Sequence, residues 1–264
     1  MPQLDEHANM LWKARQTGQH CNMLSNELTL SDAYAIQFAC TRLAPKDDPV
    51  IGYKIGATTS EVLTLLNLDE PFYGAMHQSH LHELQGERAS TLPLFVQHEP
   101  RIEAEIVVCL KSDLVRTNTD LSIDDVSASI DWVAPGLEIV AARMKAPDGK
   151  RGLFAVADFG ANQHMLIGPK HKDWQAIDLS AHAISIAVGN QTPVEGHSGM
   201  SIFGNPIHFV SWFLNHPSRH GEVLKAGSVI SCGTCTGALP LADGDSVIAN
   251  FGSLGTLNLN IKAI

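Results

Sequence analysis

The chain has 264 residues, of which 44% are hydrophobic and 17% charged. This composition is typical of a globular protein with a sizeable core and excludes an intrinsically disordered chain. The formal net charge of −10 argues against binding to duplex nucleic acid or to an anionic membrane, because both partners require a basic face. An anionic substrate would need local positive charge from a metal ion or a lysine.

The N-terminus is acidic and lacks the apolar stretch of a secretory signal, and no apolar run approaches the roughly 18 to 20 residues of a membrane-spanning helix. The five cysteines are odd in number and lie mostly among apolar residues. Together these features predict a cytoplasmic protein with reduced thiols.

The first elements along the chain are predicted to be helical. Residues 6–16 lack the alternation of a strand, and apolar residues at helical spacing follow Ser31, a candidate capping residue. A break at 45–49, where two prolines flank three charged residues, ends this part. We therefore expect a helical N-terminal region over 1–50 and a β-rich catalytic body over 51–264, which together form one functional domain.

Strands dominate the predicted body. Residues 50–57 form a glycine-punctuated strand, followed by a short helix through Leu66 that Thr58, Thr59 or Ser60 caps. Further strands are predicted at 102–110 and 137–142, with a helix over 121–133 that Pro135 and Gly136 end.

Toward the C-terminus, a hairpin turns at Gly189 and Asn190, a helix runs from Asn205 to about Asn215, and a strand with alternating apolar residues covers 256–262. Strands follow one another without regularly alternating helices, which is not the pattern of a doubly wound sheet. The predicted fold class is α+β, with a mixed β-rich body and a helical N-terminal region.

Two acids inside an apolar strand carry the strongest chemical signal. Glu103 and Glu105 are two residues apart, so in a strand both carboxylates point to one face. Burial of two like charges costs several kcal/mol unless the face is exposed, a basic residue pairs with them, or a divalent cation binds. Glu138, in a second apolar strand, favours the cation. Three carboxylates suit Mg²⁺ or Mn²⁺ and leave about three positions of an octahedral ion for water or substrate.

Other polar residues carry weaker signals. Lys54 lies between apolar neighbours and glycines, where a lysine can hold a carboxylate or move a proton, although the local pattern by itself favours an edge lysine that reaches solvent. Asp158 precedes a glycine and also fits a turn. Cys232 and Cys235 have CxxC spacing without a second pair, so a zinc ribbon is not expected. The histidines at 77, 80 and 82 are interpreted as surface residues.

Several of these segments, in this order and spacing, resemble the 2-keto-4-pentenoate hydratase family within the fumarylacetoacetate hydrolase superfamily, over about residues 30–262. The motifs that carry the resemblance are residues 52–58, 71–74, 100–106, 131–140, 204–206 and 243–245, with Arg143 and Asp158. The resemblance implies a mixed-β body, a divalent metal (Mg²⁺ or Mn²⁺) bound by Glu103, Glu105 and Glu138, and an active-site lysine at Lys54. It also implies a homo-oligomer that acts in meta-cleavage catabolism of aromatic or steroid rings.

Substrate contacts are expected from Tyr73, Asp158 and Thr234, the last of these to the substrate carboxylate. The chain departs from the family pattern at two positions. Phe72 stands where relatives often carry aspartate, and Phe159 stands where they often carry asparagine. Both departures favour a bulkier or more apolar substrate and put the usual proton relay in doubt.

The resulting hypothesis is a metal-dependent hydratase. A 2-hydroxy-2,4-dienoate would chelate the metal, take a proton at carbon 5 to become a 2-oxo-3-enoate, and add water at carbon 4 to give a 4-hydroxy-2-oxoalkanoate. The expected partners are this small-molecule substrate, further copies of the chain and a downstream aldolase or decarboxylase, with no nucleic acid and no membrane.

Three alternatives remain. A 2-oxo-3-enedioate (4-oxalocrotonate-type) decarboxylase would need a second cationic pocket. A C–C hydrolase would need a His–Glu pair, for which adjacent His98 and Glu99 are poorly placed. A non-catalytic paralogue or partner subunit would explain the two phenylalanines.

Overall fold

The computed structural model describes residues 2–21, 27–85, 88–115, 119–219 and 222–264. Its α-helices are α1 (Pro2–Thr17), α2 (Leu30–Thr41), α3 (Ser60–Leu66), α4 (Ile123–Ala128), α5 (Arg151–Ala157) and α6 (Pro206–Asn215). Short 3-10 helices are η1 (Gln78–His80), η2 (Val96–His98), η3 (Phe159–Ala161), η4 (Trp174–Ala176), η5 (Pro217–Arg219) and η6 (Gly252–Leu254).

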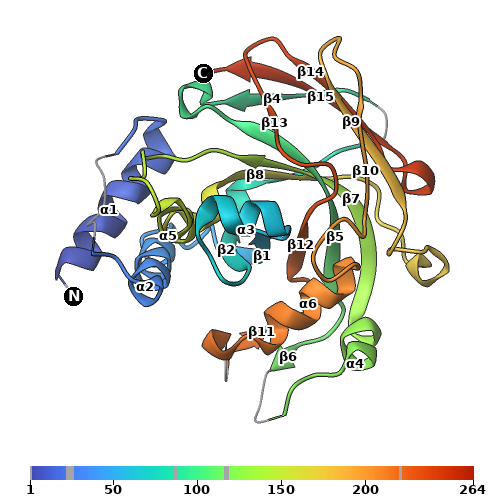
Figure 1. The fold of residues 1–264 in the computed structure, drawn as a ribbon, viewed down its shortest axis with the longest axis horizontal. Coiled ribbons are helices and arrows are strands. Elements are labelled where there is room, and N and C mark those ends of the chain that lie inside the picture. The colour runs from blue at the N-terminus through green and yellow to red at the C-terminus, as the bar shows by residue number, and fades with distance from the viewer. Residues whose placement is uncertain (1, 22–26, 86–87, 116–118, 220–221) are drawn as a thin grey trace.

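A large mixed sheet forms the centre of the molecule (Figure 1). Its strands, in spatial order, are β2 (Phe72–His77), β1 (Val50–Gly56), β12 (Val229–Thr234), β5 (Arg101–Leu110), β7 (Ile130–Val140), β8 (Asn162–Ile167) and β3 (Leu81–Glu83). The short β13 (Leu239–Pro240) also pairs with β5. β1 runs parallel to β12, and β3 runs parallel to β8.

A second sheet packs beside the first. Its order is β10 (Val194–His197), β9 (Ala183–Val188), β14 (Ser246–Asn250), β15 (Thr256–Ala263) and β4 (Ser90–Leu94). A small two-stranded sheet pairs β11 (Val223–Leu224) with β6 (Leu114–Val115). The hairpin predicted at Gly189 connects β9 to β10, and the predicted C-terminal strand is β15, so both predictions are confirmed.

The large sheet curls into a half-barrel. β2 and β3 end the spatial order on opposite sides, yet only η1 separates them in the chain. Figure 1 shows β5 and β7 as long, bent strands of this sheet. The curl encloses a small apolar cluster that includes Met76, Val107, Trp132 and Met165, separate from the main core. A sheet curved in this way can hold side chains from several strands within reach of one another.

The N-terminal helices belong to the main hydrophobic core. Leu11 and Trp12 of α1 and Ile36 of α2 cluster with Ile106 of β5 and Phe159 of η3. Helix α2 begins after Thr29, whose hydroxyl forms a capping box with Asp32, and not after the predicted Ser31. The mixed β-rich body with N-terminal helices confirms the predicted fold class. The boundary at residue 50 stays a prediction, since one core spans both sides of it.

The helix predicted over 121–133 was wrong in its second half. Helix α4 ends at Ala128, and β7 runs from Ile130 to Val140 without a break at Pro135. The Pro135 carbonyl accepts from the Gly168 N–H just beyond the end of β8. In an antiparallel strand the N–H of a residue points to the same side as its carbonyl, so the N–H that proline lacks would face the point where the β8 ladder stops. The Pro135–Gly168 pair therefore makes one hydrogen bond instead of two, at a place where the regular β7–β8 ladder has already ended and only an isolated bridge between Val133 and His171 follows.

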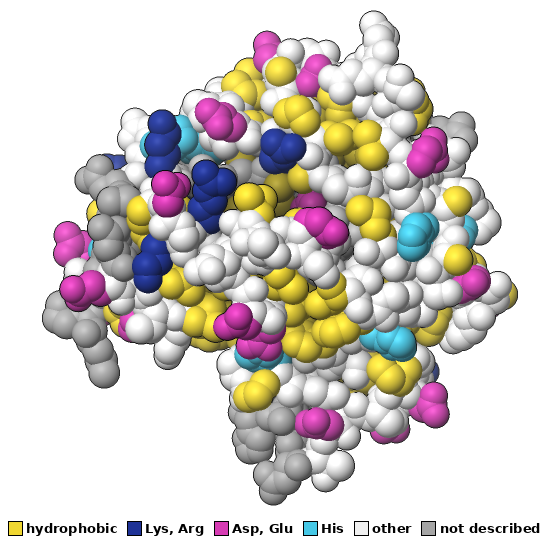
Figure 2. Space-filling model, in the orientation of Figure 1, with side chains coloured by type: hydrophobic (Ala, Val, Ile, Leu, Met, Phe, Trp, Pro, Cys, Tyr) yellow, Lys and Arg dark blue, Asp and Glu magenta, His cyan; other side chains and the backbone are white. Residues whose placement is uncertain are grey.

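Charged side chains are unevenly placed on the surface. Figure 2 shows acidic groups scattered over one face, while the basic groups gather toward its left side. Within the described residues, no helix is long and apolar enough to cross a membrane.

Candidate active site

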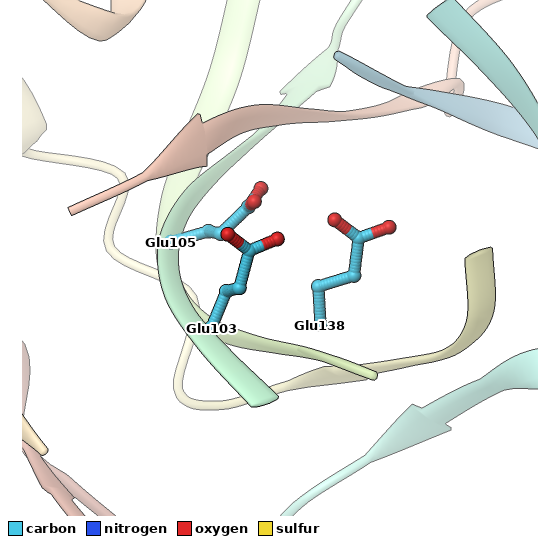
Figure 3. A group of neighbouring side chains, drawn as sticks. All are labelled: Glu103, Glu105 and Glu138. Atoms are coloured by element: carbon cyan, nitrogen blue, oxygen red, sulfur yellow. The ribbon is translucent and has the colours of Figure 1, made fainter. Parts of the chain in front are cut away.

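The structure brings together the three glutamates singled out from the sequence, here called the glutamate triad (Glu103, Glu105 and Glu138). Glu103 and Glu105 alternate along β5 and share a face, and Glu103 lies directly opposite Glu138 of β7. One carboxylate oxygen from each lies within 4.8 Å of the others. Figure 3 shows the three side chains pointing toward one another from neighbouring strands. Glu105 and Glu138 are buried, and Glu103 is half-buried, so the site opens on the side of Glu103.

Burial and mutual repulsion strongly perturb the triad. Burial, with the nearby Glu138 carboxylate, raises the pKa of Glu103 to about 7 and raises the pKa of Glu105 well above its usual range. Hydrogen bonds offset part of this effect: the Ser231 hydroxyl and the Gly233 N–H, at 3.0 Å, both donate to one Glu105 oxygen. Without a cation, the triad does not keep all three negative charges at neutral pH.

Lys54 supplies a positive charge at the same place. It lies in β1 beside Ser231 of β12, and its Nζ is 3.2 Å from Glu138 Oε2 and 3.1 Å from the carbonyl oxygen of Gly160. Burial by itself would lower the pKa of Lys54, but Glu138, Glu103 and Glu105 outweigh burial and raise it. Lys54 is therefore protonated in the folded protein. Its pKa is raised, whereas burial without the neighbouring glutamates would lower it.

Two side chains border this lysine and the carboxylates. The Phe72 ring lies 5.4 Å from Lys54 Nζ, and a Cβ at Gly56 or Gly160 would approach that ring within 3 Å. The two glycines thus make room for the phenylalanine. Thr234 ends β12 opposite Glu105, and a hydrogen bond from it lowers the pKa of Glu103. Its predicted contact with a substrate carboxylate stays a prediction.

The structure does not bring Tyr73 to the triad. Tyr73 pairs with Ile55, so it points to the opposite face of the sheet from Lys54. Its hydroxyl lies 2.7 Å from that of Ser218, and its ring stacks on Tyr34. The neighbouring Phe72 takes the face that Lys54 shares. The substrate-binding role of Tyr73 stays a prediction.

Asp158 also lies away from the carboxylates, at the end of α5. One oxygen accepts from the Arg143 guanidinium at 2.7 Å, and the other accepts from the Arg143 backbone N–H at 2.9 Å. Both oxygens are thus engaged inside the protein, and both residues are buried. A direct contact of Asp158 with substrate stays a prediction.

The donor set of the triad fits a hard divalent cation. Carboxylate oxygens are the ligands that Mg²⁺ and Mn²⁺ prefer, and a +2 charge would relieve the repulsion that raises two of the three pKa values. Within the described part of the chain, Glu138 Oε2 has no hydrogen-bond partner apart from its ion pair with Lys54. By contrast, burial raises the pKa of the thiols of Cys232 and Cys235, which disfavours the thiolates that zinc requires.

Sequence reasoning missed three residues that contact the triad. Ser231 and Gly233 contact Glu105, and Asn162 donates its amide to Glu138 Oε1 at 2.8 Å. A buried asparagine cannot be distinguished from a loop asparagine without knowledge of its fold. Gly233, with φ of +90°, shows a usable signal: a glycine inside an apolar strand often marks a bulge or a close approach.

A curled mixed sheet with an acidic triad and a lysine at its centre defines the class, a β-rich protein whose buried carboxylates could hold a divalent cation. Residues 70–262 match the family model described as fumarylacetoacetate (FAA) hydrolase C-terminal. The chain therefore belongs to the fumarylacetoacetate hydrolase family.

The chain resembles relatives of two activities. It is 33% identical to a 2-hydroxyhexa-2,4-dienoate hydratase of Comamonas testosteroni, over 88% of this chain and 86% of that protein. It is 28% identical to a 4-oxalocrotonate decarboxylase of Pseudomonas putida, over 88% and 85% of the two chains. The structure superposes on a 4-oxalocrotonate decarboxylase from Pseudomonas putida G7 with a TM-score of 0.85 and 24% identity, covering 100% and 98% of the two chains. These likenesses confirm the fold and leave hydratase and decarboxylase unresolved.

Proposed function

We propose that this protein is a divalent-metal-dependent lyase that hydrates a 2-hydroxy-2,4-dienoate, through its 2-oxo-3-enoate tautomer, to a 4-hydroxy-2-oxoalkanoate. The observation that carries the proposal is the glutamate triad beside a protonated, buried lysine. The relative with the highest identity reported above is named as a hydratase of a 2-hydroxydienoate, which supports the same reaction class.

Glu103, Glu105 and Glu138 would hold the ion, Mg²⁺ or Mn²⁺. When bound, such an ion acts as a Lewis acid on a substrate oxygen and balances negative charge. Neighbouring residues hold two of the three glutamates in place. Ser231 and Gly233 hold the Glu105 carboxylate from the β12 side, while Lys54 and Asn162 hold the two oxygens of Glu138.

Lys54 has two tasks in this proposal. Its ammonium group binds the substrate carboxylate, and it can deliver a proton to the dienoate because it is protonated when the site is empty of substrate. Phe72 closes the site beside the ammonium and keeps water from that side. A proton from Lys54 is the simplest source, since the side chain that faces Lys54 from β2 is a phenylalanine with no proton to give.

A decarboxylase acting on a 2-oxo-3-enedioate is the second candidate, and Arg101 favours it. Arg101 precedes Glu103 by two residues in β5, so it lies on the same face at the open end of the site. It is exposed, and its attraction lowers the pKa of Glu103. Its guanidinium is held by the Ala238 carbonyl at 2.7 Å from Nη2. This cation could bind the second carboxylate that a dioate carries.

The other two alternatives find less support. His98 is buried beside His20, with ring centroids 5.0 Å apart, and burial lowers its pKa. It thus packs against another histidine, whereas Glu99 is exposed, and no hydrogen bond or ion pair found among the described residues joins the two side chains to activate water for a C–C hydrolase. A non-catalytic paralogue is separated from an enzyme only by an assay.

The deciding experiment incubates the purified protein and Mg²⁺ with 2-hydroxypenta-2,4-dienoate or with 2-oxohex-3-enedioate and identifies the products. We expect a 4-hydroxy-2-oxo acid from the first substrate, loss of turnover in EDTA, and recovery with Mg²⁺ or Mn²⁺. Release of CO₂ from the second substrate alone would favour the decarboxylase. Full activity in chelator, or in the Glu103→Ala variant, would contradict the metal-dependent mechanism, and metal binding without any turnover would indicate the paralogue.

A further inference from the structure

The orientation of Glu138 depends on an asparagine that the register of β8 turns toward it. Ile139 pairs with His164, but the next residue, Val140, pairs with Asn162, so one extra residue bulges out of β8. Val140 and Glu138 lie two apart in β7 and share a face, and the bulge therefore directs Asn162 to the face of Glu138. The amide Nδ2 of Asn162 donates to Glu138 Oε1 at 2.8 Å, and both side chains are fully buried.

Asn162 is itself held by two arginines. Its backbone carbonyl accepts from Arg143 Nη2 at 2.7 Å and from Arg15 Nη1 of α1 at 2.9 Å. Arg143 is fixed in turn by Asp158, through its guanidinium and its backbone N–H. A chain of hydrogen bonds therefore runs from the N-terminal helix and from α5 to the carboxylate of Glu138.

The stability of the fold does not by itself explain why two arginines and an aspartate are buried here. Arg15 and Arg143 are 4% and 1% exposed, and among the described residues Asp158 forms an ion pair with Arg143 but not with Arg15. Burial and the neighbouring Arg143 lower the pKa of Arg15 to about 9, and Arg15 Nε and Nη2 have no hydrogen-bond partner among the described residues. Buried ionic groups of this kind are often replaced by apolar residues without loss of stability. A requirement for defined geometry explains the cost better.

We propose that Asn162 is a positioning residue for Glu138, and that Arg143, Asp158 and Arg15 of α1 act through it. The inference rests on the proposed metal-binding role of the glutamate triad. With Lys54 on one oxygen and Asn162 on the other, the Glu138 carboxylate is held in one orientation before a cation arrives. Outer residues that orient metal ligands in this way typically change metal affinity about 10- to 100-fold when they are removed.

The test measures Mn²⁺ affinity in the substrate-free protein from the electron paramagnetic resonance signal of free Mn²⁺. We expect Asn162→Ala to bind Mn²⁺ about 10- to 100-fold more weakly than the unaltered protein. Asp158→Asn, which keeps the side-chain shape and lies away from the triad, should weaken binding in the same direction by a smaller factor. The matched control is Asn215→Ala, because Asn215 also makes amide hydrogen bonds, half-buried ones to residue 121, but in the contacts of the described residues it has no path to Glu138.

Each result separates the two proposals. Equal Mn²⁺ affinity in Asn162→Ala and the unaltered protein overturns the positioning role and leaves the metal site standing. If the unaltered protein and Glu105→Gln bind Mn²⁺ equally poorly, the proposed metal site fails and the positioning role fails with it. Circular dichroism melts identify any variant that does not fold. If Asn162→Ala is unfolded, Asp158→Asn decides, and unchanged affinity in that variant counts against the proposal.

Discussion

Two clusters of ionisable side chains lie against the large sheet, and they respond to burial in opposite ways. The glutamate triad points to one face of the sheet. A histidine cluster (His80, His82 and His164) lies on the other face, since His164 pairs with Ile139 next to Glu138. In this cluster His82 Nε2 lies 3.0 Å from His164 Nδ1, and the His80 and His164 rings stack with centroids 5.3 Å apart.

The difference between the clusters shows what burial costs each residue type. Burial lowers the pKa of all three histidines, that of His164 to about 3, so they are neutral at physiological pH without any partner ion. Burial raises the pKa values of Glu103 and Glu105, but Ser231 and Gly233 donate hydrogen bonds to Glu105 and Lys54 places a positive charge beside Glu138. A buried acidic cluster with strongly perturbed pKa values, a lysine beside it and donors aimed at it is the better candidate for function. Of the three histidines that were interpreted as surface residues, His77 is buried and His80 and His82 are half-buried, so that interpretation was wrong for His77 and only partly right for the other two.

The largest expected effect comes from removing the positive charge of the triad. Lys54→Met keeps the apolar stem and deletes the ammonium, which leaves Glu138 Oε2 without its partner. We expect kcat to fall by about 10²- to 10⁴-fold, the usual range for a lost proton-transfer group. Steady-state assays at saturating Mg²⁺ measure this effect. Retention of kcat within about twofold would assign Lys54 a structural role and remove the functional side of the comparison.

A smaller effect tests whether the triad site extends to Arg101. Arg101→Ala removes an exposed cation from the open end of the site. Loss of a charged hydrogen bond worth about 1.5 to 3 kcal/mol should lower the ratio of kcat/KM for a dicarboxylate over a monocarboxylate about 10- to 100-fold. Assays with the two substrate classes give this ratio. A ratio that does not change would show that Arg101 only anchors the Ala238 loop and would weaken the case for a decarboxylase.

The smallest effect concerns the histidine cluster and is confined to stability. Unfolded histidine gains a proton near pH 6.5, whereas folded His164 does so only near pH 3. Well above pH 6.5 His164 is neutral in both states and does not affect the free energy of unfolding. As the pH falls from 6.5 toward 3, only the unfolded chain takes up the proton, so the free energy of unfolding decreases. Between pH 6.5 and 5 the loss should be about 2 kcal/mol for His164 alone. Urea unfolding of the unaltered protein and of His164→Gln at pH 7.5 and 5.0 measures it, and equal acid sensitivity of the two proteins would contradict this account.

Much of the fold could be predicted because its signals are local. Alternation of apolar residues predicts β15, turn residues predict the β9–β10 hairpin, and Asn205 followed by a proline predicts the start of α6. The prediction failed over 121–133, where helical spacing continues into β7. A proline normally ends an element, and only the neighbouring strand, which ends opposite Pro135, makes it acceptable there.

The candidate site also has a part that the sequence could predict and a part that it could not. Glu103, Glu105 and Lys54 could be selected from the sequence because charged residues in apolar strands need an explanation, and their chemistry follows from their type. The face on which Tyr73 points, the bulge that directs Asn162, and the pairing of Arg143 with Asp158 depend on strand register and on contacts between distant segments. No local pattern contains that information.

By itself, the sequence determined a mixed β-rich fold and a set of acids and one lysine whose burial demands compensation, because residue type and alternation are properties of the chain. Only the tertiary structure decided that Glu138 stands opposite Glu103, that Phe72 rather than Tyr73 borders Lys54, and that the N-terminal helix reaches the site through Arg15 and Asn162. These facts arise from the curl and register of one sheet, which bring residues more than a hundred positions apart into contact.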